Sequence, residues 1–408
     1  MDMTTRDSVL DWLSTSEDAI GRIHAQLEHL ATIPLPTPMS SWTPRLEELR
    51  ELIGVAFWAS LRSNEERPTR VRIALTPRHL VPNAFALASP VDYDEAQVAK
   101  LAQVVPTYRS LLVSPEADGL KIWGLSNSSP GGGIDGITAE VAAPGIVRVD
   151  IDVFRPFAVF TGRSVFLIES GGRVALAHYL QRALRKRLPN EDIVALHQAW
   201  HECIVLGVLA TMIVDQGHGG TILVVPDAEG EWLGSIDPFA FKFSAPDYTA
   251  QEWVRQNLPF NQSRSETVAR IWSSNLSDED KMAATLSLTG RPWQPREAVQ
   301  HIGPLANCDG AIVITHDLKV LGFGAKIRTR DRGVPMLCRL DPAPGLQELR
   351  PCHLEDFGGT RHQSAARFVS AHNTCVAVVI SQDRRMSVVN WSDEHNCLIA
   401  VEHAEWWS

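Results

Sequence analysis

Five segments near the C-terminal end of the chain constrain its fold more than any other part. Four are short, strongly apolar runs that predict β-strands, and the fifth, residues 360–372, predicts a helix between the second and third runs. Because such strands pack into a sheet covered by helices, we predict a separate α/β domain with a mixed sheet here. The strand segments are CDGAIVIT (308–315), LKVLGFGAKI (318–327), TCVAVVIS (374–381) and MSVVNW (386–391).

The preceding residues predict an α+β region. Short apolar runs separated by turn-forming residues occupy 68–170 and predict strands, two helices follow within 175–214, and a buried strand follows at 221–226. An N-terminal helix is expected to end before the prolines of 33–44. The predicted fold class is α/β, with the chain divided into an N-terminal helix and proline-rich linker (1–45), an α+β region (46–290) and the α/β domain (291–408).

Length, charge and cysteine usage limit the class of protein. A chain of 408 residues exceeds what one hydrophobic core usually supports, so several domains are expected. The formal net charge of −10 argues against broad binding to nucleic acid or to an anionic membrane. The N-terminus shows no export signal, the most apolar run (203–214) is too short to span a bilayer, and no Cys-x-x-Cys pair occurs. We therefore expect a cytoplasmic protein with reduced thiols.

The stretch CDGAIVITHD (308–317) contains the first candidate site residues. Asp309 directly precedes a run of aliphatic residues, so its carboxylate should lie at the end of a strand, where ligand crevices form. Gly310 would allow backbone or ligand to approach closely. An ordinary Asp-Gly turn before a strand is the other interpretation of these two residues.

The stretch GGTRHQSAARF (358–368) contains the second set. Thr360 and Gln363 have the spacing of a capping box, in which the threonine side chain accepts from the N3 amide and the glutamine reaches back to the N-cap amide. That role alone would explain both residues.

A phosphate site is the second interpretation of the same stretch. Gly358 and Gly359 leave the approach to the helix start open, and free amides there favour an anion. Arg361 is suited to bind phosphate with two hydrogen bonds, and His362 to bind a metal or a phosphate oxygen. The residues alone leave both interpretations open.

The two stretches together resemble the diadenylate cyclase (DAC) domain, over about residues 295–402. The resemblance rests on Asp-Gly-Ala opening a strand and Gly-Thr-Arg-His opening a helix about fifty residues later. It implies that two ATP molecules meet in a head-to-head homo-oligomer contact, where the 3′-hydroxyl of each attacks the α-phosphate of the other. The products are cyclic di-AMP and pyrophosphate, and the cofactor is Mg²⁺ or Mn²⁺.

The resemblance also assigns roles to individual residues. Asp309 and His362 would hold the metal, and catalysis would use these two with Gly310 and Arg361. In the family the motif ends in Arg-His-Arg, whereas this chain has Gln363 in the last place, and only Asp383 is available for an acidic residue after the following strand. The residues expected to contact nucleotide phosphate are Gly358, Gly359, Thr360, Arg361 and Gln363.

The departures keep a second hypothesis open, a catalytically silent DAC-like domain that binds nucleotide as a sensor or scaffold. The region upstream is similar to predicted sensor regions found N-terminal to some bacterial DAC domains, in segments 109–114, 120–126 and 149–168. That similarity implies a regulatory module that detects a ligand and adjusts the C-terminal domain.

Other patterns have simpler explanations. Asp150 and Asp152 share one face of a strand as metal-binding pairs do, but no Gly-Ser turn precedes them, so an amphipathic strand is favoured. His197 and His201 lie four residues apart, with Glu202 beside them, which is a spacing that can bind one metal ion. A zincin motif would need histidine in place of Val205, so a pair of partly buried structural histidines is favoured.

Two further stretches carry weaker sequence signals. The sequence GGGIDG (131–136) lacks the strand and helix context of a dinucleotide loop and indicates a flexible turn. A row of cations after the second C-terminal strand fits either a triphosphate site or a solvated strand edge. It consists of Lys326, Arg328, Arg330 and Arg332.

Overall fold

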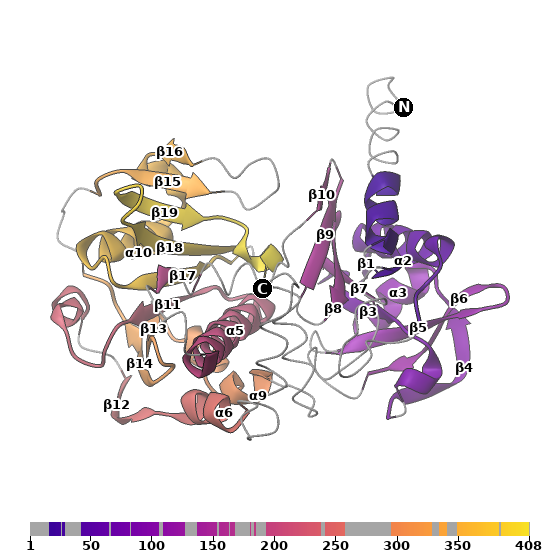
Figure 1. Cartoon of the computed structure of the whole chain (residues 1–408), viewed down its shortest axis with the longest axis horizontal. Coiled ribbons are helices and arrows are strands. Elements are labelled where there is room, and N and C mark those ends of the chain that lie inside the picture. Colours follow the sequence, from indigo (N-terminus) through magenta and orange to yellow (C-terminus); the bar gives the residue numbers. More distant parts are fainter. Residues whose placement is uncertain are drawn as a thin grey trace. The chain divides into compact units, whose positions relative to one another are not determined.

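Two β-sheets organise the chain in the computed structural model, one in each of two units (Figure 1). Unit 1 comprises the described residues up to 167, and unit 2 those from 180 to 257 and from 295 onward. The structure describes residues 16–28, 42–126, 137–167, 180–184, 193–257, 295–340 and 349–407, except 26, 65–66, 82, 106–108, 153–154, 163, 181–182, 238–240, 329–333 and 383–384.

Unit 1 contains an eight-stranded sheet in the order β10-β9-β8-β7-β3-β5-β6-β4. Neighbouring strands are antiparallel except β3 and β5, which are parallel. The elements are α2 (Leu46–Ser60), β3 (Val71–Leu75), β4 (Phe85–Asp92), α3 (Glu95–Leu101), β5 (Ser110–Glu116), β6 (Gly119–Leu125), β7 (Ile137–Ala143), β8 (Ile146–Asp152), β9 (Arg155–Thr161) and β10 (Val165–Leu167), with a small hairpin of β1 (Ser63–Asn64) and β2 (Arg67–Pro68).

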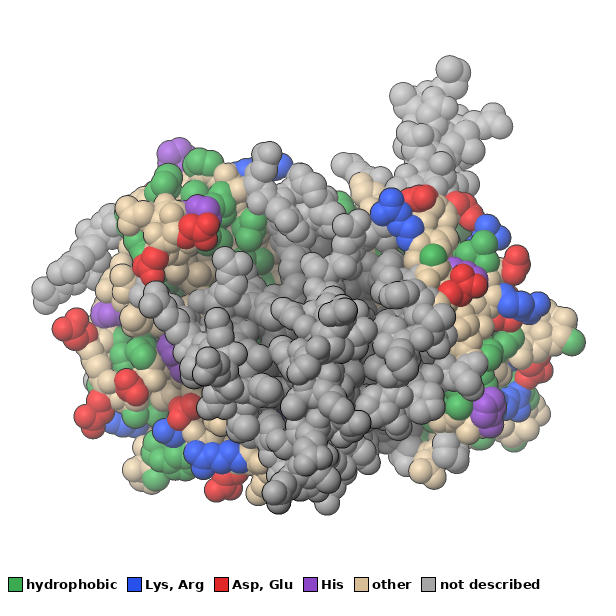
Figure 2. Space-filling model, viewed as in Figure 1, with side chains coloured by type: hydrophobic (Ala, Val, Ile, Leu, Met, Phe, Trp, Pro, Cys, Tyr) green, Lys and Arg blue, Asp and Glu red, His purple; other side chains and the backbone are tan. Residues whose placement is uncertain are grey.

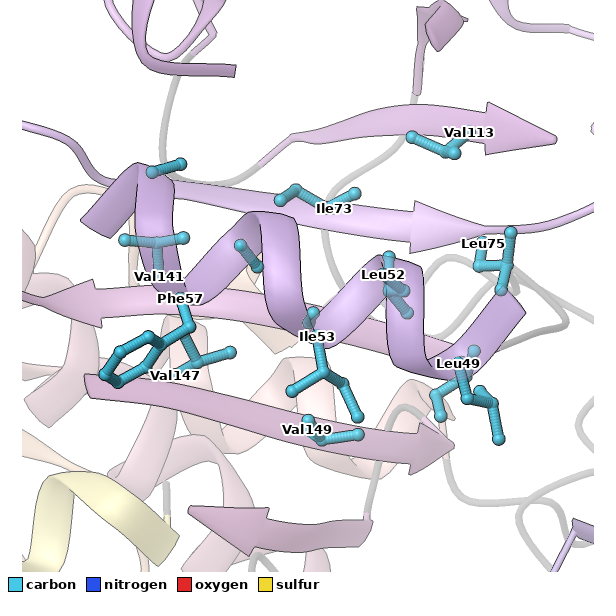
Figure 3. Packing of buried hydrophobic residues seen from close by; sticks show 14 of the residues in the cluster. Leu49, Leu52, Ile53, Phe57, Ile73, Leu75, Val113, Val141, Val147 and Val149 are labelled. Atoms are coloured by element: carbon cyan, nitrogen blue, oxygen red, sulfur yellow. The ribbon is translucent and has the colours of Figure 1, made fainter. Parts of the chain in front are cut away.

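Helix α2 covers one face of this sheet because its apolar residues recur every three or four positions. Leu49, Leu52 and Ile53 are buried and lie over Ile73 and Val149 of the strands (Figure 3). Residues 16–25 are helical as predicted and contribute to the same core. The N-terminal helix therefore belongs to unit 1, although the predicted boundary at residue 45 separated it from α2.

Unit 2 contains a nine-stranded mixed sheet in the order β12-β14-β13-β11-β17-β18-β19-β15-β16. Its α-helices and strands are α5 (Ile193–Gln216), β11 (Gly220–Val225), β12 (Phe241–Asp247), α6 (Thr249–Asn257), α9 (Pro295–Val299), β13 (Ala311–Thr315), β14 (Val320–Ala325), β15 (Leu337–Leu340), β16 (Arg350–Cys352), α10 (Thr360–Ala371), β17 (Val376–Ile380), β18 (Met386–Ser392) and β19 (Cys397–Val401). The short 3₁₀ helices are η1 (Arg78–Leu80) in unit 1 and η2 (Glu231–Ser235), η3 (Gly303–Asn307), η4 (Leu354–Phe357) and η5 (Ala404–Trp407) in unit 2.

Helices cover both faces of the central strands in unit 2. Leu223 and Val225 of β11 belong to the core that includes the buried face of α10. On the opposite face, a Cβ at Gly220 would lie 3.0 Å from Ile213 of α5. All residues of β11 and β13 are buried, which explains their continuous aliphatic sequences. The predicted α/β class and the mixed sheet flanked by helices are confirmed.

The sheet of unit 2 extends beyond the predicted domain. β11 pairs in parallel with β13 and antiparallel with β17, and β12 pairs with β14. The boundary predicted at residue 291 therefore falls within one continuous sheet. β11, the first strand of this sheet in the sequence, is separated by a long segment from its partners β13 and β17. The hydrophobic pattern of a strand does not indicate which distant strand it pairs with.

Acidic and basic side chains are interspersed on the described surface of each unit in the face shown in Figure 2. This mixture accords with a sequence in which 48 acidic residues stand against 38 Lys and Arg residues. Among the described residues, no helix is long and apolar enough to cross a membrane.

Candidate functional site

The predicted site residues lie around one end of the central strands in unit 2. β11 and β13 begin there, and β14 and β17 end there, as the pairings of Thr221 with Ala311, Ala311 with Ala325, and Gly220 with Ile380 require. This is the amino end of the parallel pair, whereas the crevice rule behind the expectation for Asp309 refers to carboxyl ends. The candidate site therefore lies at the opposite end of the strands from the one that this rule describes.

Asp309 stands two residues before β13 with a side chain that is 82% exposed. Lys326, immediately after β14, places its Nζ 3.2 Å from a carboxylate oxygen of Asp309. Gly310, between Asp309 and the start of β13, has φ +118°. A Cβ at this residue would lie 2.4 Å from the carbonyl carbon of Gly324. Gly310 therefore allows the close backbone approach that was expected and keeps Asp309 beside the end of β14.

The start of α10 differs from the capping box that the sequence predicts. The N-cap is Gly359, Thr360 is the first helical residue, and no side chain caps the helix. The Gln363 side chain donates a 3.0 Å hydrogen bond to the carbonyl oxygen of Gly358, whereas a capping box would have it accept one from the N-cap amide. The capping-box prediction is wrong because the helix starts one residue earlier than it assumed, with Thr360 already inside the helix. Gly358, Gly359 and Thr360 are exposed. The backbone amides that begin α10 have no side-chain cap.

Arg361 brings α10 to the start of β11. Its side chain is beside the turn before β11, because a Cβ built on Gly219 would lie 2.9 Å from Arg361 Nη1. Gly219 and Asp309 each stand two residues before the paired residues Thr221 and Ala311. Because β11 and β13 are paired in parallel, Asp309 and the turn beside Arg361 lie at the same end of two neighbouring strands. The structure therefore places both residues at one end of the sheet.

His362 faces the segment that leads into α10. Its ring makes an edge-to-face contact with Phe357, with centroids 5.2 Å apart, and a Cβ on Gly358 would lie 3.0 Å from His362 Nδ1. Within the described part of the chain, no group of three or more His, Cys, Asp or Glu side chains is arranged to hold a metal. The joint metal role of Asp309 and His362 stays a prediction.

Two side chains hold the segment before α10, and sequence reasoning missed one of them. Arg339 of β15 donates a hydrogen bond to the carbonyl oxygen of Asp356 and lies 3.4 Å from Glu402. Gln363 holds the carbonyl of Gly358, two residues further along. Arg339 and Gly219 gave no sequence signal of their own, because each acts through a contact with a distant element.

The far end of α10 contains a buried polar contact. A ring nitrogen of His372 lies 2.8 Å from Ser235 Oγ of η2. Burial lowers the pKa of His372, and the nearby Glu231 opposes this effect only in part. The imidazole is therefore favoured in its neutral form, which suits a structural role at this end of the helix.

The predicted row of cations is partly described. Lys326 pairs with Asp309, and Arg328 pairs with Asp237 in the adjoining segment after η2. Arg330 and Arg332 lie outside the described residues, as does Asp383. Both described cations thus have an acidic partner.

Asp150 belongs to a buried ion network on the sheet of unit 1. Arg72 Nη2 and Arg148 Nη2 donate to the same oxygen of Glu140, at 2.6 and 2.7 Å. Asp150 lies 3.2 Å from Arg148 and 3.8 Å from Arg72. Its carboxylate thus lies beside guanidinium groups from its own strand β8 and from β3. The side chain of Asp152 lies outside the described residues.

The remaining sequence candidates give no site. His201 is fully buried in α5, and Glu202 accepts a hydrogen bond from Gln198 at 3.0 Å. The side chain of His197 and the segment 131–136 lie outside the described residues.

Comparison with known families gives one match. Residues 40–127 match the family described as "Probable sensor domain DACNV". The matched range runs from just before α2 to the end of β6 and includes two of the three segments, 109–114 and 120–126, on which the sensor resemblance rested. Neither the curated proteins nor the solved structures contain a match to the chain.

Proposed function

We propose that unit 2 is a nucleotidyltransferase of the diadenylate cyclase type, which condenses two ATP molecules into cyclic di-AMP and releases pyrophosphate. The observation that supports this proposal is that Asp309 and Arg361 lie at the same end of the paired strands β11 and β13. A carboxylate and a guanidinium at one sheet end are the charges that a metal–triphosphate substrate requires. Their motifs lie about fifty residues apart in the sequence.

Arg361 and the start of α10 would bind the phosphates. The guanidinium can donate two parallel hydrogen bonds to phosphate oxygens, and the uncapped amides after Gly359 add donors of fixed direction. Thr360 and the glycine pair are exposed and leave room for the anion. In the reaction, the 3′-oxygen of one ATP bonds to the α-phosphorus of the other. The bond from that phosphorus to the bridging oxygen breaks, its electron pair leaves with pyrophosphate, and the hydroxyl proton passes to water. The same transfer in the other direction closes the ring and releases the second pyrophosphate.

The donor set fits a divalent cation that arrives with its nucleotide. Mg²⁺ is usually bound through one or two carboxylates together with substrate phosphates, and Asp309 supplies an exposed carboxylate. His362 is the second protein ligand in this proposal. The bound cation would neutralise charge on the triphosphate. Lys326 would then exchange its contact with Asp309 for one with phosphate.

Unit 1 would regulate this reaction. The match of residues 40–127 to a probable sensor domain, of a kind found N-terminal to DAC domains, supports a regulatory role for unit 1. The ligand that it detects is left open by this proposal. ATP as substrate places the proposed reaction in the cytoplasm.

The proposal requires two copies of the chain, because each protomer would contribute half of the reacting pair. Turnover per protomer should therefore fall when the protein is diluted below its dimer dissociation constant. Measuring product formation and sedimentation over the same concentration range tests this. Concentration-independent turnover by a demonstrated monomer would contradict the head-to-head arrangement.

The direct test is incubation of the full chain with ATP and Mn²⁺ or Mg²⁺, with products resolved by mass. We expect cyclic di-AMP from the unaltered protein and none from Asp309→Asn, because a carboxamide binds a hard cation much more weakly than a carboxylate. Asp227→Asn is the matched control, since Asp227 is an exposed aspartate beyond the other end of β11. Full turnover by a folded Asp309→Asn variant would overturn the assignment.

A nucleotide-binding protein without catalysis is the second candidate. It is favoured by Gln363, which holds the Gly358 carbonyl and adds no charge, and by the ion pair of Asp309 with Lys326. This candidate predicts that ATP binds in calorimetry while no dinucleotide product forms with either metal.

A further inference from the structure

The turn between α5 and β11 occupies a special position at the candidate site. Gly217 and Gly219 have φ +74° and +68°, in the left-handed region that favours glycine. His218 between them is exposed, whereas Gly219 is buried. The two glycines thus share a backbone conformation but differ in what surrounds them.

Gly219 is enclosed by the end of β17 and the side chain of Arg361. A Cβ at this position would lie 2.8 Å from the Ile380 carbonyl oxygen, 2.9 Å from Arg361 Nη1 and 3.1 Å from the Ser381 carbonyl carbon. The first and third atoms belong to the end of β17, and the second to the side chain that α10 extends over the turn. The guanidinium therefore lies where a side chain at position 219 would otherwise be.

We propose that Gly219 is a positioning residue that holds the Arg361 guanidinium in the orientation needed to bind nucleotide phosphate. An arginine side chain has many rotamers, and a surface that fixes its head group reduces the entropy lost on binding. The turn beside Arg361 supplies that surface, because without a Cβ at Gly219 the guanidinium can lie against its backbone. The inference rests on the proposed function, because it presumes that Arg361 binds phosphate.

Nucleotide affinity in a double-mutant cycle tests the inference. The probe is 3′-deoxy-ATP with Mg²⁺, which lacks the attacking hydroxyl, and its binding to the full chain is followed by calorimetry. We expect Gly219→Ala to weaken binding about tenfold, which is about 1.4 kcal/mol, because the new methyl group displaces Arg361. Gly217→Ala is the matched control, since Gly217 lies in the same turn with a similar positive φ and alanine there brings similar backbone strain.

The cycle is completed in an Arg361→Met background. If Gly219 acts through Arg361, then Gly219→Ala should change affinity less than twofold once the guanidinium is absent. An equal loss in both backgrounds would mean that the alanine acts through the end of β17, and it would overturn the inference. Thermal unfolding of each variant shows that the comparison is between folded proteins.

The failure of the inference differs from the failure of the proposed function. If Arg361→Met binds the probe as tightly as the unaltered chain, Arg361 does not bind phosphate and the proposed function itself fails. If Arg361→Met weakens binding while Gly219→Ala matches Gly217→Ala, only the positioning role is refuted.

Discussion

Replacing Glu140 by glutamine should show how much the buried ion network stabilises unit 1. The Glu140 carboxylate oxygen accepts hydrogen bonds from Arg72 and Arg148, whose side chains are only 7% and 6% exposed. Glutamine keeps the shape and an acceptor oxygen but removes the charge between two buried guanidinium groups. Asp150 would then face both cations at 3.8 and 3.2 Å.

The expected loss in the free energy of unfolding is about 3 kcal/mol. Breaking a buried ion pair by removing one partner costs about 3–5 kcal/mol. The lower end applies because Glu140 is 28% exposed and the glutamine oxygen still accepts hydrogen bonds. With an m-value of about 2 kcal/mol/M, the urea midpoint of unit 1 should fall by about 1.5 M.

Hydrogen exchange measured by mass spectrometry on the full chain locates the effect. Amides of β3, β7 and β8 should lose protection, while those of β13 in unit 2 should keep it. The control is Asp118→Asn, which removes an exposed partner of Lys121 at 2.8 Å and should leave exchange of these strands unchanged. Unchanged protection of β7 in Glu140→Gln would refute the view that the network stabilises the sheet.

Three further predictions concern unit 2. Gly310→Ala should destabilise it by more than about 3 kcal/mol in denaturant unfolding, because its Cβ would meet the backbone of Gly324 at 2.4 Å with φ already at +118°. Burial lowers the pKa of His372 below that of the unfolded chain, so stability should fall as the pH drops below about 6.5. His372→Asn should reduce this dependence in thermal unfolding between pH 7 and 5.5, and an unchanged slope would assign it to other groups. Burial raises the pKa of Cys375 to about 12, so iodoacetamide at pH 8 should label this thiol far more slowly than the partly exposed Cys308, as peptide mass spectrometry can measure.

The sequence predicts the elements of unit 2 better than it predicts their pairing. Val313 and Val378 lie in runs of aliphatic residues that become strands buried on both faces, and such runs are readable without a structure. β11 was also recognised as a strand, but nothing in its six residues indicates that its neighbours are β13 and β17. Pairing over long sequence distances depends on tertiary packing, so the predicted boundary at 291 divided the sheet.

Chemistry and spacing select candidate residues from the sequence but give no geometry for the site. Asp309 and Arg361 were selected in this way, and the structure places them at the same end of the sheet. Gly219 was missed because its role arises from a contact with Arg361, and glycine-rich turns are common. The start of α10 was misplaced by one residue because both Gly359 and Thr360 are acceptable N-caps, and the local sequence does not decide between them.

The pairing of β11 also has a consequence for synthesis of the chain on the ribosome. β11 ends at Val225, but its two partners begin at Ala311 and Val376. A ribosome that adds about 5–20 residues per second synthesises these partner strands several to tens of seconds after β11. During that interval the apolar strand GTILVV has two unpaired edges, which are sites for non-native strand pairing. Nascent chains stalled before residue 376 should therefore recruit chaperones or aggregate, while unit 1, whose strands pair within residues 71–167, is already able to fold.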